Sequence, residues 1–230
     1  MRDWWKPCLA ELIGTFALIF IGAGSICAHQ YLISHQQGGI GVLGIAIAHG
    51  LVVAVMVSNI GHISGGHINP AVTLGVMVAG KIETNLALMY IASQLVGGSV
   101  AGFLLLGIFS PEVRNAVNLG TPGLSPDVSF GVGTLLEAIL TFFLVFTVFA
   151  TAIDDRGAFK SIAGFGIGLV VAFDILMGGP LTGASMNPAR TFGPALASGY
   201  WSNHLVYWIG PMIGGAGAGL VYGGIFLKKS

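Results

Sequence analysis

Residues 183–191 read GASMNPART and residues 66–73 read GHINPAVT, so one short motif occurs twice in the chain. In each copy an Asn stands where a helix N-cap is expected. Pro follows at the first helical position, where its missing N–H has no intrahelical partner to lose. A short run of apolar and small residues comes after each Pro, 71–79 and 189–198. At 1.5 Å per residue such a run covers about half of a ~30 Å hydrocarbon core. The motif therefore predicts two half-length helices.

The composition is that of an integral membrane protein. Of the 230 residues, 54% are hydrophobic and 8% are charged, whereas soluble domains carry about 25% charged residues. Nine basic and nine acidic residues leave no basic face for nucleic acid. Cys8 and Cys27 show neither a zinc-ligand spacing nor a disulfide framework. Because no nucleophile, metal cluster or nucleotide loop is recognisable, we expect neither an enzyme nor a cofactor.

Apolar runs of spanning length place six membrane helices. The runs lie at about 9–33, 41–60, 85–109, 131–153, 161–178 and 203–227. The two half-length helices follow the second and the fifth run, and inside a membrane they must be buried in protein or line a wet cavity. The sequence thus predicts an all-α membrane protein with six transmembrane helices and two re-entrant half-helices. The longest connection, 110–129, is expected to fold over the pore mouth.

The two halves of the chain repeat each other. Seven residues between Leu9 and Phe20 recur 126 positions later, between Leu135 and Phe146. With three spanning helices in each half, the second copy is inverted relative to the first. We therefore expect one transmembrane domain, 1–230, with inverted repeats at about 1–110 and 130–230. Secondary transporters share this architecture, so the repeat alone leaves both a channel and a carrier open.

Glu11 and Glu137 occupy equivalent places inside apolar helices. An intramembrane carboxylate is a functional-site hypothesis by default. The alternative is structural: each carboxylate accepts backbone N–H groups where the loop before a half-helix leaves regular structure. We favour this structural role. The sequence assigns no role to Asp174, a third intramembrane carboxylate.

Lys and Arg set the expected orientation. With the N-terminus inside, seven of these residues are cytoplasmic and one is outside; they are Arg2, Lys6, Lys81, Arg156, Lys160, Lys228 and Lys229 against Arg114. Both termini are then cytoplasmic. The expected host is the plasma membrane, with a vacuolar membrane as the alternative.

Arg190, which lies close after the second Asn, is assigned to neither side of the membrane in this count. A permanently charged guanidinium between apolar segments is costly unless it faces water or a partner. Facing a pore, it donates hydrogen bonds to passing oxygens and repels cations. We therefore expect Arg190 to line the pore rather than the lipid surface.

The paired boxes resemble those of the aquaporin family over nearly the whole chain; they are Asn69-Pro70-Ala71 and Asn187-Pro188-Ala189. The resemblance implies half-helices that enter from opposite faces and meet Asn to Asn, with their positive ends at mid-membrane. It also implies passive, single-file permeation of water with protons and ions excluded. A homotetramer in the lipid bilayer and a structural role for Glu11 and Glu137 follow from the same resemblance.

The resemblance further implies a selectivity filter outside the Asn pair, formed by His49, Ile175, Ala184 and Arg190. The common water-selective pattern has Phe in place of His49 and His in place of Ile175. We therefore expect a somewhat wider opening with one less polar wall, similar to that of plant vacuolar-membrane aquaporins. His67 is expected in the cytoplasmic vestibule.

Three alternatives to a water channel follow from these residues. A broader small-solute channel would also pass glycerol, ammonia or hydrogen peroxide, although Thr191 and Ala195 differ from the acidic and basic residues of glycerol facilitators. A secondary carrier needs a coupling-ion site, for which Glu11, Glu137 and Asp174 are the candidates. A junction protein with a vestigial pore is disfavoured by the intact Asn pair and Arg190.

Overall fold

The structure of the chain, a computed structural model, describes residues 3–157 and 162–227 and consists of helices and loops over these residues. Six helices are long and apolar enough to cross a membrane. They are α1 (Trp5–Ser34), α2 (Gly41–Ser64), α4 (Thr84–Ile108), α6 (Phe130–Val148), α7 (Ala163–Thr182) and α9 (Val206–Val221), where the spans of α6 and α9 continue through π-helical turns to Ile153 and Phe226. The predicted all-α fold with six spanning segments is confirmed over the described residues.

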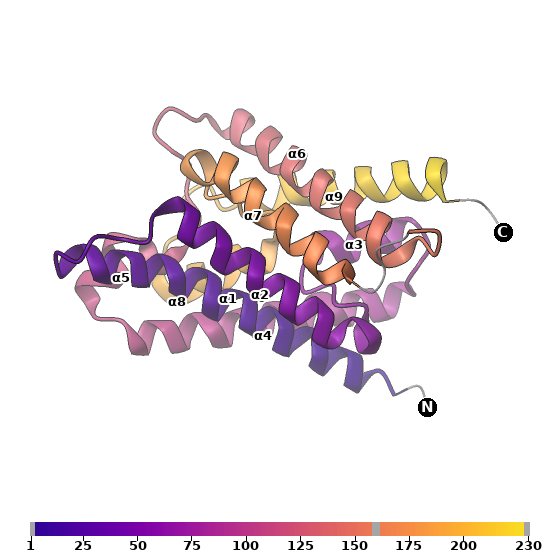
Figure 1. Ribbon diagram of the computed structural model, residues 1–230, viewed down its shortest axis with the longest axis horizontal. Coiled ribbons are helices and arrows are strands. Elements are labelled where there is room, and N and C mark those ends of the chain that lie inside the picture. Colours follow the sequence, from indigo (N-terminus) through magenta and orange to yellow (C-terminus); the bar gives the residue numbers. More distant parts are fainter. Residues whose placement is uncertain (1–2, 158–161, 228–230) are drawn as a thin grey trace.

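Two short helices follow the two Asn residues. Helix α3 (Pro70–Val78) has 9 residues and α8 (Pro188–Ser198) has 11. They are therefore about 14 and 17 Å long, roughly half of a hydrocarbon core. Figure 1 shows α3 and α8 toward opposite ends of the long axis. These are the predicted half-helices, each beginning at its Pro.

Helices α2 and α7 extend four residues beyond the predicted ends at 60 and 178. Each stops at a left-handed glycine, Gly65 (φ 91°) or Gly183 (φ 84°), which is a common geometry for a helix end. Hydropathy alone ends both helices early because their last turns contain His62 or Pro180. Residue 161, the predicted start of the fifth span, lies outside the described residues.

Close backbone contacts hold the half-helices between the spanning helices. A Cβ atom at Gly98 of α4 would lie 2.9 Å from the carbonyl oxygen of Ala189 in α8. A Cβ atom at Gly75 of α3 would lie 2.7 Å from the carbonyl oxygen of Gly215 in α9. Small residues let helix backbones approach this closely in lipid. Each half-helix is thereby held against one spanning helix of the other half.

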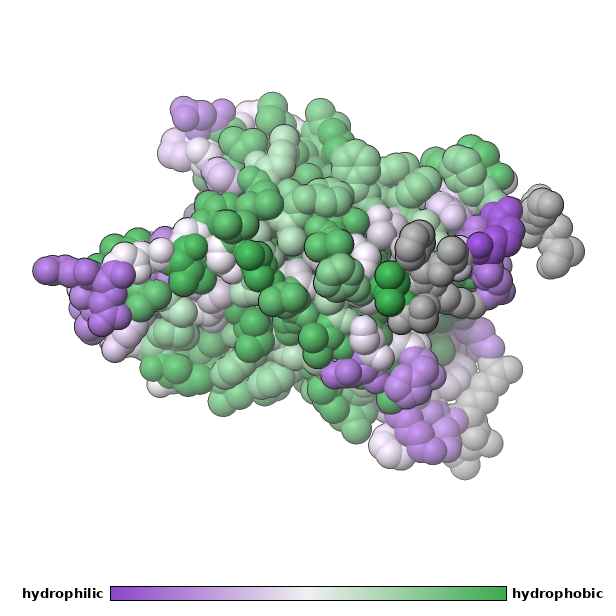
Figure 2. Space-filling view, viewed as in Figure 1, coloured by the Kyte–Doolittle hydropathy of each residue, from purple (hydrophilic) through white to green (hydrophobic). Residues whose placement is uncertain are grey.

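The outer surface matches a lipid environment. Figure 2 shows hydrophobic residues over the middle of the molecule and hydrophilic residues at both ends of its long axis. Large apolar side chains such as Leu51 of α2 and Leu169 of α7 are more than half exposed, at 54% and 52%. Such exposure is unfavourable in water but not against acyl chains. The chain is a multi-pass membrane protein.

The start of α1 and the end of α9 lie at the same end of the molecule (Figure 1). The loop between α4 and α6, which includes α5 (Pro111–Ala116) and a 3₁₀ turn η1 (Asn118–Gly120), lies at the opposite end. Four cations used to predict the orientation lie outside the described residues, namely Arg2, Lys160, Lys228 and Lys229. Which end faces the cytoplasm stays a prediction.

Candidate functional site: a narrow channel between two half-helices

Both Asn residues cap their half-helices. Asn69 is extended (φ −158°), and its Oδ1 accepts from the backbone N–H of Ala71 at 2.8 Å. Asn187 is extended in the same way, and its Oδ1 accepts from the N–H groups of Ala189 and Arg190 at 3.0 and 3.2 Å. Because Oδ1 is bound to the helix start, each amide nitrogen points away from its own helix.

The amide nitrogens bind across the junction between the two halves. Asn69 Nδ2 donates to the carbonyl oxygen of Met186 at 2.8 Å, and Asn187 Nδ2 donates to that of Ile68 at 2.9 Å. An Asn amide has two N–H groups, so one of each pair remains. Both Asn side chains line the same cavity. The second N–H of each is therefore available to a molecule in that cavity.

Glu11 holds the first loop from α1. Its carboxylate is fully buried and accepts four hydrogen bonds. The donors are Ser64 Oγ at 2.6 Å, His67 N at 2.9 Å, Ile68 N at 2.6 Å and Gln94 Nε2 at 2.8 Å. Two of these donors are backbone N–H groups of the loop, which would otherwise be buried without a partner. Glu11 thus satisfies the backbone that the loop leaves unpaired.

Glu137 holds the second loop from α6 in the same way. It is fully buried and accepts from Thr182 Oγ1 at 2.7 Å, Ser185 N at 2.9 Å and Met186 N at 2.7 Å. The two loops are alike in backbone as well, because Ile68 (φ 45°) and Met186 (φ 54°) are both left-handed. This conformation is uncommon for such side chains, and the carboxylate hydrogen bonds help to keep it.

The four residues assigned to the filter come together in the structure. His49, Ile175, Ala184 and Arg190 line the same cavity as the two Asn residues. The space open to the centres of water molecules there is about 30 Å³, so water-sized molecules fit inside it. All four side chains are at most 4% exposed. The cavity is a constriction rather than a solvent-filled cleft.

Arg190 is fixed at two points. Its Nη1 donates to the carbonyl oxygen of Gly120 at 2.7 Å, and its Nη2 lies 3.4 Å from His49 Nε2. His49 Nδ1 lies 2.9 Å from the carbonyl oxygen of Ile45. A carbonyl oxygen only accepts, so Nδ1 carries the proton and Nε2 is an acceptor for Arg190. The filter thus presents one buried cation and a neutral imidazole.

Gly120, in the loop between α4 and α6, is a partner of Arg190 that the sequence analysis did not predict. Asn118, Leu119 and Gly120 are three successive left-handed residues, with φ of 47°, 55° and 73°. They direct the Gly120 carbonyl inward, toward the filter. Asn and Gly tolerate this conformation, but a backbone carbonyl leaves no signal in a sequence. The prediction that this loop covers the pore mouth did not include this contact.

His67 lies where the constriction opens into a wider vestibule. It lines both the narrow cavity and a second cavity, of about 640 Å³, whose lining includes His62, Ser64 and Lys81. His67 Nδ1 is 3.1 Å from Thr73 Oγ1, and its ring packs edge-on against Tyr90. The wide vestibule is at the end of the molecule opposite the 110–129 loop.

A family model described as "Major intrinsic protein" matches residues 1–222. Among curated relatives, Aquaporin TIP4-4 of Zea mays is 48% identical over 227 residues, covering 97% of this chain and 88% of that protein. Aquaporin TIP2-1 of Arabidopsis thaliana is 43% identical over 227 residues, covering 98% and 89%.

The chain belongs to the major intrinsic protein family. This is a family of membrane channels, not enzymes.

A solved structure, described as the X-ray structure of the aquaglyceroporin from Plasmodium falciparum, has the same fold. It aligns with a TM-score of 0.84 over 97% of each chain at 22% sequence identity. At that identity the likeness shows the fold alone. The predicted fold class and the predicted family are thus confirmed.

Asp174 of α7 differs from Glu11 and Glu137, whose carboxylates accept hydrogen bonds from the two loops. It is 1% exposed, and neither oxygen has a hydrogen-bond partner within the described part of the chain. It is also absent from the residues that line the constriction. Sequence reasoning assigned Asp174 no role, and the structure places it away from the channel.

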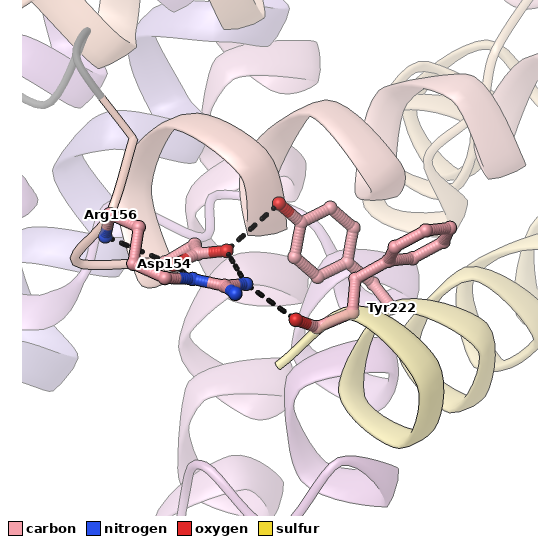
Figure 3. A network of polar contacts seen from close by, with 4 residues as sticks. Asp154, Arg156 and Tyr222 are labelled. Atoms are coloured by element: carbon pink, nitrogen blue, oxygen red, sulfur yellow. Dashed lines mark hydrogen bonds and ion pairs between the residues drawn. The ribbon is translucent and has the colours of Figure 1, made fainter. Parts of the chain in front are cut away.

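A polar cluster lies where α6 and α9 end in π-helical turns, η2 (Phe149–Ile153) and η4 (Tyr222–Phe226). Figure 3 shows Asp154 between Arg156 and Tyr222. Arg156 donates to both Asp154 oxygens, at 2.9 and 2.6 Å, and to the carbonyl oxygen of Phe226, while Tyr222 donates to Asp154 at 3.2 Å. The Arg156 guanidinium holds the pKa of Asp154 below its usual range. The cluster ties the turn after α6 to the end of α9.

Proposed function

We propose that this protein is a passive channel that conducts water across a membrane and excludes protons and ions. The observation that carries the proposal is the constriction itself. Asn69, Asn187, Arg190 and His49 line one cavity of about 30 Å³, and each Asn has one N–H available to a molecule in it. A water oxygen between the two Asn donors has both lone pairs occupied. It therefore cannot accept a proton from the next water in the file.

Electrostatics support the exclusion of cations. The N-termini of α3 and α8 meet at the Asn pair, and each carries a partial positive charge. Arg190 adds a full positive charge in the same narrow cavity. A cation that has lost its hydration shell finds mainly donors there. Neutral molecules avoid this barrier.

The charge-neutral wall of the filter favours small neutral solutes as a second class of permeant. Ile175 and Ala184 give the constriction an apolar side, which tolerates ammonia, hydrogen peroxide or glycerol better than a ring of polar groups. The relatives' names speak of aquaporins, and the solved structure is titled an aquaglyceroporin. We rank water first because the Asn donors and Arg190 are placed for an oxygen acceptor.

A secondary carrier is disfavoured by the state of the three intramembrane carboxylates. The oxygens of Glu11 and Glu137 are occupied by hydrogen-bond donors from the loops and helices around them. Asp174 does not line the constriction. None of the three therefore offers a coupling-ion site on the permeation path.

Stopped-flow light scattering on proteoliposomes tests the proposal. Vesicles are challenged in turn with sucrose, glycerol and ammonium gradients, beside empty vesicles and the His49→Phe variant. Fast shrinkage in sucrose with slow re-swelling in glycerol establishes a water channel. Glycerol re-swelling as fast as shrinkage, suppressed by His49→Phe, assigns a broad small-solute channel instead. Shrinkage no faster than that of empty vesicles refutes both.

Three further proposals concern the whole molecule. The repeats at about 1–110 and 130–230 form one inverted pair within a single domain, 1–230, which the matching hydrogen bonds of Glu11 and Glu137 support.

The protein assembles as a homotetramer in the bilayer, and cross-linking in native membranes tests this. Both termini are cytoplasmic and the host is the plasma membrane; protease protection and membrane fractionation test these two points.

A further inference from the structure

His49 has no free space behind its ring. The ring is 3% exposed and is held by α2 through the contact of Nδ1 with the Ile45 carbonyl. Its other side faces α1 at Gly22. A Cβ atom built on Gly22 would lie 2.5 Å from His49 Nε2 and 2.6 Å from Cδ2. Both separations are far shorter than van der Waals contact, so only a residue without a side chain fits beneath the ring.

The backbone does not explain this glycine. Gly22 lies in the interior of α1, with no positive φ that would require glycine. In a helix interior glycine is less favourable than alanine. The helix therefore accepts an unfavourable residue at the position where the filter imidazole needs room.

We propose that Gly22 is a positioning residue for the channel: it sets where the His49 ring stands, and with it the width of the constriction and the contact between His49 and Arg190. This inference rests on the proposed function. Any side chain at position 22 pushes the ring away from α1. The ring lines the cavity together with Ile175 and Arg190, so we infer that the displaced ring narrows the path.

The first arm of the test compares Gly22→Ala with Gly107→Ala. Gly107 is a helical glycine of α4 whose added Cβ meets nothing within 4 Å, so it controls for the change in helix propensity. We expect Gly22→Ala to lower the water permeability per folded channel by roughly tenfold, the factor of a barrier of ~1.4 kcal/mol. Gly107→Ala should match wild type. A folded Gly22→Ala channel with wild-type permeability overturns the proposal.

The second arm asks whether the effect acts through His49. In the double variant Gly22→Ala/His49→Ala the ring that the new Cβ would strike is absent. Its water permeability should equal that of His49→Ala alone. A double variant as slow as Gly22→Ala shows a general packing defect and overturns the proposal. If Gly22→Ala does not fold, the double variant decides: recovery of folded protein supports the contact, and failure to recover it refutes the contact.

A third readout is independent of flux. The ¹⁵N chemical shifts of the His49 ring should report a neutral imidazole protonated at Nδ1 in wild type and a changed environment in Gly22→Ala. Unchanged shifts overturn the proposal. If wild-type vesicles shrink no faster than empty ones, the proposed function fails, while the ring shifts still decide whether Gly22 positions His49.

Discussion

The two loops that precede the half-helices have nearly the same construction and different chemistry. In each, a left-handed glycine ends a spanning helix, a buried Glu from the first helix of that half binds the loop, and an Asn caps the half-helix. A tyrosine hydroxyl closes each arrangement: Tyr90 donates to the carbonyl oxygen of Ser64 at 2.9 Å, and Tyr207 to that of Thr182 at 2.7 Å. The scaffold is therefore shared.

The difference lies in what each loop presents to the channel. Where the second half has Arg190, the first has Val72, and where the first has His67, the second has Ser185. Both Val72 and Arg190 line the constriction. At this pair of equivalent positions, therefore, only the second half of the chain places a charged side chain in the constriction. The comparison teaches that the shared scaffold positions the Asn pair, whereas the chemical difference between the loops comes from single residues on that scaffold.

The largest expected effect comes from the two carboxylates. Each oxygen of Glu11 accepts two hydrogen bonds, whereas one oxygen of Glu137 accepts only one, from Met186 N. A Gln amide can turn its NH₂ toward a single backbone donor at either position, Met186 N at 137 or His67 N at 11, because the Ser64 hydroxyl can also accept. At about 1–3 kcal/mol for each unsatisfied buried donor, Glu11→Gln and Glu137→Gln should destabilise by similar amounts.

Thermal unfolding in detergent, followed by intrinsic fluorescence, measures both losses. Glu112→Gln on the exposed helix α5 serves as the control and should unfold like wild type. A loss at position 11 twice that at position 137 would contradict this count of unsatisfied donors.

Arg190→Val makes the second loop copy the first, which has Val72 at that place. A unit charge ~4 Å away at an effective dielectric constant of ~20 contributes about 4 kcal/mol. Its removal should raise cation and proton leak by up to about a thousandfold, while water still passes the Asn pair. Dye-reported proton uptake and sodium flux in proteoliposomes measure the leak, with Val72→Ala as the uncharged control. An unchanged leak would assign ion exclusion to the helix ends alone.

The tyrosine pair should behave symmetrically. Tyr90→Phe and Tyr207→Phe each remove one buried hydrogen bond to the end of a spanning helix, so each should lower stability by about 1 kcal/mol and the melting temperature by ~2–4 °C. The two losses should add in the double variant because the two hydrogen bonds are at the ends of different helices, α2 and α7. Non-additive losses measured by thermal unfolding would show that the loops are coupled beyond the Asn contacts.

The smallest effect concerns the cluster around Asp154, which belongs to the second half alone. Because Arg156 lowers the Asp154 pKa, the cluster stabilises the fold above the ordinary Asp value of about 3.9. This contribution falls as the pH falls through the folded-state pKa. The stability difference between wild type and Asp154→Asn should be constant from pH 7 to pH 5 and shrink below about pH 4. A difference that already changes between pH 7 and pH 5 would contradict this assignment.

Much of the fold followed from local signals in the sequence. Apolar runs placed the six spans, and Asn followed by Pro placed the starts of α3 and α8, because N-capping depends on neighbouring residues. The repeat at a shift of 126 residues singled out Glu11 and Glu137 as a pair. These signals are periodic or short-range, and they need no knowledge of packing.

The contacts that fix the filter were not visible in the sequence. Arg190 binds a backbone carbonyl 70 residues away, and every residue has such a carbonyl. Gln94 joins Glu11 to Thr73 from a helix whose sequence shows only small and apolar residues around it. Gly22 looks like any other small residue of a packed helix until the His49 ring is placed against it. Partners of this kind appear only with the three-dimensional structure.

The crossed bonds of Asn69 and Asn187 have a consequence for how the chain is made. They join atoms 117 and 119 residues apart. At about 5–20 residues per second the ribosome needs roughly 6–25 s to cover that distance. During this interval the Ile68 carbonyl and the Asn69 amide of the first half lack their partners and must stay hydrated. The narrow channel can therefore form only when the last third of the chain has inserted.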